Sequence, residues 1–257
     1  GPVSYEFRIR PGAPLDVAQV YERLRALGIT CGYEPVSRTL TCARLESSLR
    51  PVQAEIGGDE ANVFINAYSS PADYATALDL VEALMPSPAS RFQPESFTEW
   101  FPREELRKRF PESWTREEPA GSFAALAGQA ALPGMSVIGV AGTRHNLVVG
   151  RAFVQRFSKR DAPRALERAF HRLQHIEEEG YVVAERVPLS KDNDRVTASI
   201  WDPSRATVIR SPNTHAGGLD LVQVKVDGER ILFPVTALEA VVGVELEPLD
   251  EVSFAVP

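Results

Sequence analysis

The chain has 257 residues, of which 44% are hydrophobic and 25% charged, as in globular proteins of one large or two smaller domains. Its formal net charge of −7 argues against nucleic-acid binding, because phosphate binding needs a positive surface. No apolar run approaches the roughly 20 residues of a membrane-spanning helix, and the lack of an export signal predicts a cytoplasmic protein. Lysine is scarce beside arginine and alanine, which indicates a bacterial genome rich in GC.

Residues 3–85 predict an N-terminal lobe in the order β-α-β-β-β-α. A first helix follows Asp16 and ends at Gly28, a residue suited to the position after a helix. A second helix begins at Pro71, with Ser70 as its N-cap. This order predicts a sheet with helices packed on one face.

The only two cysteines lie within this lobe, in the segment ITCGYEPVSRTLTCARL. A turn centred on Val36 and Ser37 places Cys31 opposite Cys42 in an antiparallel hairpin. In a cytoplasmic protein we expect two reduced thiols in the core, because disulfides persist mainly in oxidising compartments.

Residues 86–119 predict a connecting segment that is rich in both proline and aromatic residues. Flexible linkers contain few aromatic residues, so we expect this segment to pack against the body of the protein. The alternative is an exposed acidic and aromatic surface that binds a partner, since aromatic residues are favoured at interfaces. The residues predicted to bind the partner are Glu95, Glu99, Trp100, Glu104, Glu105 and Trp114.

Residues 120–257 predict a C-terminal lobe of strands around one long helix. A hairpin turns near residues 144–146, the helix runs from Asp161 to Glu179, and several strands follow, with a short helix over 236–243. The predicted fold class is therefore α+β. It has two mixed lobes with mainly antiparallel sheets, each packed with one or two helices.

The long helix carries two histidines four residues apart, His171 and His175. At about 100° per residue, Phe170 and Leu173 fall on the core face and both histidines on the opposite face. Imidazoles at this spacing can chelate zinc, copper or nickel, so a metal site is one hypothesis. Arg172 occupies the position where metalloproteases have a glutamate, and we favour a solvated helix face without metal.

Two loops offer further candidates for chemistry. Asp192 and Asp194 stand two apart in KDNDR, a spacing that can hold a divalent cation but lacks the further ligands of an EF-hand. His215 precedes two glycines and could act as a general base, although the sequence identifies no partner for it. Turn formation explains both segments, and we expect no cofactor.

Two segments resemble known families. SYEFRIR followed by LDVAQVYERLRALGI resembles the start of bacterial immunity proteins of polymorphic-toxin systems, including the swarm-inhibition type of myxobacteria. This resemblance covers about a tenth of the chain and implies toxin neutralisation. LDLVQVKVDGERILFPVTALEAVVGVELEPL resembles the opening strands of CheW-type chemotaxis adaptor domains over about thirty residues, which we interpret as a common combination of hairpin and helix.

The sequence thus favours a non-catalytic binding protein, best interpreted as an immunity protein that neutralises a toxin by direct contact. An acidic chain is compatible with a basic toxin domain as its partner. One alternative is a hydrolase or metal-dependent enzyme that uses His215, Asp192 and Asp194 or the His171–His175 pair. A second alternative is a structural component of a bacterial assembly.

Overall fold

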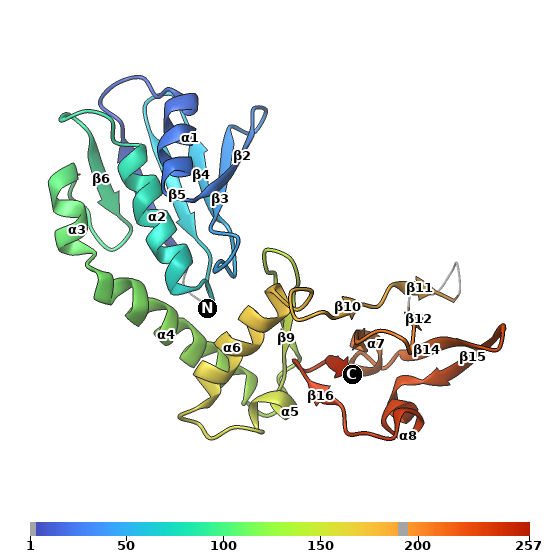
Figure 1. Ribbon diagram of the computed structural model, residues 1–257. Coiled ribbons are helices and arrows are strands. Elements are labelled where there is room, and N and C mark those ends of the chain that lie inside the picture. The colour runs from blue at the N-terminus through green and yellow to red at the C-terminus, as the bar shows by residue number, and fades with distance from the viewer. Residues whose placement is uncertain (1–3, 190–194) are drawn as a thin grey trace.

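The N-terminal part of the computed structural model, which describes residues 4–189 and 195–257, is built on one seven-stranded sheet (Figure 1). The strand order is β2-β3-β4-β5-β1-β6-β7, and every neighbouring pair is antiparallel. The strands are β1 (Tyr5–Arg10), β2 (Thr30–Glu34), β3 (Thr39–Ala43), β4 (Val52–Ile56), β5 (Ala61–Ile65), β6 (Arg91–Pro94) and β7 (Phe101–Pro102).

Two helices, α1 (Val17–Ala26) and α2 (Pro71–Ala83), cover one face of this sheet (Figure 1). The predicted helix starts are confirmed, because the side chain of Asp16 caps α1 and Ser70 forms a capping box with Asp73 at the start of α2. The predicted hairpin is confirmed as well. Cys31 lies opposite Cys42, and both thiols are free, with their sulfur atoms 3.2 Å apart.

The segment that connects the two parts of the chain is mostly regular structure. After β6 and β7 come a turn of 3-10 helix, η1 (Arg103–Glu105), and the helices α3 (Leu106–Arg109) and α4 (Glu112–Ala130). Phe92 and Phe110 are buried in the N-terminal core, and Trp114 packs against it. α4 continues away from the first sheet towards α6 (Figure 1).

The C-terminal part begins with a short hairpin of β8 (Ile138–Val140) and β9 (Leu147–Val149), followed by α5 (Arg151–Val154) and α6 (Ala162–Gln174). These elements pack on the second half of α4 around a core that includes Phe123, Leu126 and Phe170. Leu49 and Tyr68, from loops of the N-terminal part, belong to the same core. The two parts therefore share apolar packing.

Two four-stranded sheets complete the C-terminal part, in the orders β10-β13-β17-β16 and β11-β12-β14-β15. Both are mixed, because β10 pairs with β13 and β12 with β14 in parallel. Their strands are β10 (Val182–Val183), β11 (Arg186–Pro188), β12 (Val196–Trp201), β13 (Thr207–Arg210), β14 (Leu219–Val226), β15 (Glu229–Pro234), β16 (Glu247–Pro248) and β17 (Ser253–Val256). Three short helical segments accompany them: α7 (Pro212–His215), η2 (Val235–Ala237) and α8 (Leu238–Val242).

The protein therefore has an α+β fold with mainly antiparallel sheets. Three helices differ from what was predicted. Residues 151–154, which follow the turn of the predicted hairpin, form the helix α5, and α6 ends at Gln174 rather than Glu179. The 19-residue helix α4, which contains Pro119, was not predicted.

Candidate interaction surface

The edge of the seven-stranded sheet near β7 carries a cluster of aromatic and arginine side chains. Along β1, Phe7 and Ile9 are buried, so Arg8 and Arg10 point to the opposite face, because successive side chains of a strand alternate. Trp100, in the loop between β6 and β7, lies against them. The guanidinium carbons of Arg10 and Arg8 are 4.0 and 5.5 Å from the centre of its ring, within the range of cation–π contacts.

Glu60, in the turn before β5, holds both arginines in place. Its carboxylate accepts a hydrogen bond from Arg8 at 2.8 Å and one from Arg10 at 2.9 Å. These hydrogen bonds lower the pKa of Glu60. Arg8 also donates to the side chain of Gln93 at 3.2 Å. The position of Trp100 is thus supported by residues from β1, β6 and the turn before β5.

Phe97 extends this cluster around the edge of the sheet. Its ring is 39% exposed and meets Phe101 edge to face, with the ring centres 5.4 Å apart. The guanidinium carbon of Arg109, from α3, lies 5.7 Å from the centre of the Phe97 ring and 3.7 Å from that of Phe101. A hollow of about 390 Å³ lies between Arg8, Glu95 and Phe97. We call Arg8, Arg10, Phe97, Trp100 and Arg109 the aromatic–arginine surface.

Charges of both signs lie in or beside this surface. Glu95 accepts a hydrogen bond from the backbone of Glu6 at 2.9 Å, and burial raises the pKa of the Glu95 carboxyl. Glu99 is exposed and has no hydrogen bond or ion pair to another described residue. Arg10 bonds Glu60 through Nε, which leaves its two terminal nitrogens without a described acceptor. The surface therefore offers Glu99 to a cation and Arg10 to a carboxylate.

The structure separates the predicted partner-binding residues into three places. Glu95, Glu99 and Trp100 lie in the loop between β6 and β7. Glu105 forms ion pairs with Lys108 and Arg109 in its own helical turn, at 3.1 and 3.6 Å. Trp114 is partly buried, and its ring packs among those of Tyr5, Phe7, Tyr74 and Phe110.

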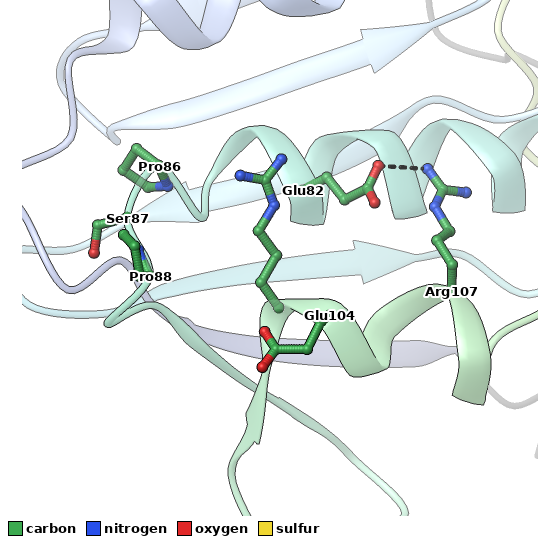
Figure 2. Close-up of a pocket in the computed structure, with 7 residues that line it drawn as sticks. Glu82, Pro86, Ser87, Pro88, Glu104 and Arg107 are labelled. Carbon is green, nitrogen blue, oxygen red and sulfur yellow. Dashed lines mark hydrogen bonds and ion pairs between the residues drawn. The ribbon is translucent and has the colours of Figure 1, made fainter.

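Glu104 borders a second hollow, of about 500 Å³, between α2 and η1. Figure 2 shows Arg107 bonded to Glu82 across this hollow, while Glu104 bonds to none of the residues drawn. Arg107 also donates to Asp79 at 2.6 Å. Within the described structure the Glu104 carboxylate is thus exposed and available, although it lies apart from Trp100.

The predicted histidine face is partly wrong. His171 is exposed as expected, but His175 is only 7% exposed and ends α6 instead of standing on a solvated ridge. Gln174, the last residue of the helix, is buried, and its side chain bonds the backbone of Arg144 and His145. The two histidine rings pack together with their centres 4.6 Å apart, and Nδ1 of His175 meets Glu178 at 3.1 Å.

The structure does not test the two loop candidates for chemistry. Asp192 and Asp194 lie outside the described residues, and His215 ends the short helix α7, with nothing described for its side chain. No group of three or more histidine, cysteine, aspartate or glutamate side chains in the described ranges is arranged to hold a metal ion.

Four members of the aromatic–arginine surface were missed by the sequence prediction: Arg8, Arg10, Phe97 and Arg109. The signal for two of them was present in YEFRIR, where the polar positions of an alternating strand must face away from the core. Phe97 and Arg109 gave no comparable signal, because their contact depends on how the β6–β7 loop meets α3.

The fold and this surface define the protein as an α+β chain with an exposed surface of aromatic and arginine residues. No family model, curated protein or solved structure matches the chain. None of the helices described over residues 4–189 and 195–257 has the length and apolar character to cross a membrane.

Proposed function

We propose that this protein acts by binding another protein through the aromatic–arginine surface. The observation that carries the proposal is the position of Trp100, held over two arginines that Glu60 fixes in turn. Tryptophan and arginine are enriched among the residues that contribute most to binding at interfaces. Side chains that are already ordered lose less conformational entropy when a partner binds.

The partner in this proposal is a toxin, and the chain is its immunity protein in a bacterial cytoplasm. Support comes from the resemblance of residues 4–29 to immunity proteins and from the net charge of −7. Glu99 and Glu104, exposed and without described ion pairs, offer carboxylates to a basic toxin domain. Complementary charges of this kind raise the association rate and the specificity for the partner more than they raise the final affinity.

The proposal predicts that a toxin gene adjoins the gene for this chain, and the domain it encodes is the probe in titration calorimetry. We expect a one-to-one complex that loses at least about 2 kcal/mol of binding free energy in Trp100→Ala, the size of a hot-spot effect. Glu99→Lys and Glu104→Lys should slow association and reduce its dependence on salt. Lys225→Glu changes a residue on β14, in the C-terminal part of the chain, and serves as the control. If Trp100→Ala binds with unchanged affinity, the aromatic–arginine surface is not the binding site.

A further inference from the structure

A groove runs between the second half of α4 and the segment that joins α5 to α6. Its volume is about 600 Å³, and it is lined largely by apolar atoms. From α4 and its end it receives Ala124, Gly128, Ala131 and Leu132, and from the other side Val154 and Phe157. Volumes and linings of this kind are typical of pockets that bind ligands.

The groove is open because α4 presents small side chains to it. Ala124, Gly128 and Ala131 recur at helical spacing and are exposed, whereas the adjacent Phe123 and Leu126 are buried in the core. A Cβ atom added at Gly128 would meet no atom within 4 Å beyond the helix itself. α4 therefore fills its core face with large side chains and leaves the groove beside it empty.

One basic residue lies in the second wall of the groove, and others lie next to the lining residues in the sequence. Lys159 lines it, and Arg151, Arg156, Arg160 and Arg164 flank the lining residues in the sequence. The single acid over residues 151–164 is Asp161, which accepts a hydrogen bond from Ser158 at 2.6 Å. Among the described residues Lys159 has no ion-pair partner. This local excess of positive charge stands out in a chain whose net charge is −7.

We infer that this groove binds an acidic amphipathic helix of a partner protein. Apolar side chains at positions i, i+3 or i+4 and i+7 would enter the groove, as in other complexes where a helix lies in a hydrophobic groove. Acidic residues that flank this stripe would face Lys159 and its basic neighbours. A membrane surface fits less well, because the apolar atoms are recessed between helices, whereas membrane-binding helices present a protruding apolar face. The inference concerns a different surface from the aromatic–arginine surface and does not depend on it.

The probe is a fluorescein-labelled helical peptide with leucines at this spacing and glutamates on both sides of the stripe, followed by fluorescence anisotropy. We expect saturable binding that weakens as salt increases. Gly128→Leu, which fills the groove, should weaken binding by at least about tenfold, equal to 1.4 kcal/mol. Lys159→Gln should weaken it several-fold.

The matched controls are Gly121→Leu, a glycine on α4 outside the groove that also has open space around it, and Lys225→Gln. Both should bind the peptide as the wild type does. A peptide of the same composition in scrambled order, and one with lysine in place of every glutamate, should bind far more weakly. Equal binding by Gly128→Leu, or by the scrambled peptide, would overturn the inference. Binding to phosphatidylserine vesicles without binding to the peptide would overturn it as well and assign the groove to membranes.

Discussion

Asp73 shows how a single buried side chain connects several segments of the N-terminal part. Its carboxylate accepts hydrogen bonds from the hydroxyls of Ser48 and Ser70 and from the backbone of Leu49, Arg50 and Ser70. Burial raises the pKa of Asp73, and these hydrogen bonds act in the opposite direction. The same carboxylate therefore caps α2 and holds the loop that follows β3.

Replacing Asp73 with alanine should lower the free energy of unfolding by about 3 kcal/mol, because several buried donors lose their acceptor. Asp73→Asn should cost less, since an amide oxygen can still accept from the backbone. Urea unfolding followed by circular dichroism measures both. Asp59→Asn, in an exposed turn, is the control. Equal stability of Asp73→Ala and the wild type would show that this network contributes nothing.

The stability of the fold depends on pH through His171. Partial loss of solvent around the His171 ring lowers its pKa, and the neighbouring His175 lowers it further, while a hydrogen bond to the backbone of Glu46 and the charge of Glu178 oppose both. The unfolded chain therefore binds a proton at His171 more readily than the folded one does. The contribution to stability is complete above the ordinary histidine pKa of about 6.5 and is lost as the pH falls below it. Urea midpoints measured at neutral pH and near pH 5.5 should differ less in His171→Gln than in the wild type.

At the scale of elements, α4 marks the limit of what the sequence could predict. α1, α2 and the cysteine hairpin were predictable because caps, turn residues and alternation act locally. In α4 the buried positions recur at helical spacing, but only Phe123 and Leu126 among them are large and apolar, and Pro119 lies within the helix, where proline is normally unfavourable. Tertiary packing on both cores overrides these local signals. The position of Trp100 was likewise unpredictable, since it depends on contacts between distant strands.

Phe123 tests the role of α4 in joining the two parts. Its side chain is fully buried in the core that α4 shares with α6 and with Tyr68. Phe123→Ala should lower the free energy of unfolding by about 3–5 kcal/mol through the cavity it leaves. Chemical denaturation provides the measurement, and Phe97→Ala, at a partly exposed ring, should cost much less. Similar losses in the two variants would contradict the packing described for α4.

The edge strand β15 is the element most open to self-association. Ile231 and Leu232 are 45% and 48% exposed on its two faces, and within the described structure only β14 pairs with it. Exposed apolar edge strands tend to pair with other chains, and a charge on the edge prevents this. Ile231→Lys should reduce association at high protein concentration in sedimentation velocity. If Ile231→Lys associates as the wild type does, β15 is not the strand through which the chains associate.

At the scale of the whole molecule, the two parts are connected through packing and hydrogen bonds as well as through the chain. Leu49 and Tyr68 enter the core of the C-terminal part, Thr143 donates to the backbone of Leu49 at 2.9 Å, and Ser122 accepts from the backbone of Tyr68 at the same distance. The aromatic–arginine surface and the groove beside α4 thus lie on different parts of a connected molecule. A partner that contacted both would bind more tightly than either contact alone allows.

The central claim is that this chain acts by contact through Trp100 and the arginines around it. The measurement that tests it most directly is the dissociation constant of the complex with the toxin domain predicted to be encoded next to this chain, for the wild type and for Trp100→Ala. We expect a stoichiometric complex that Trp100→Ala weakens by about thirtyfold or more, with the fold unchanged by circular dichroism. The absence of a complex, or the same dissociation constant in both proteins, would contradict it.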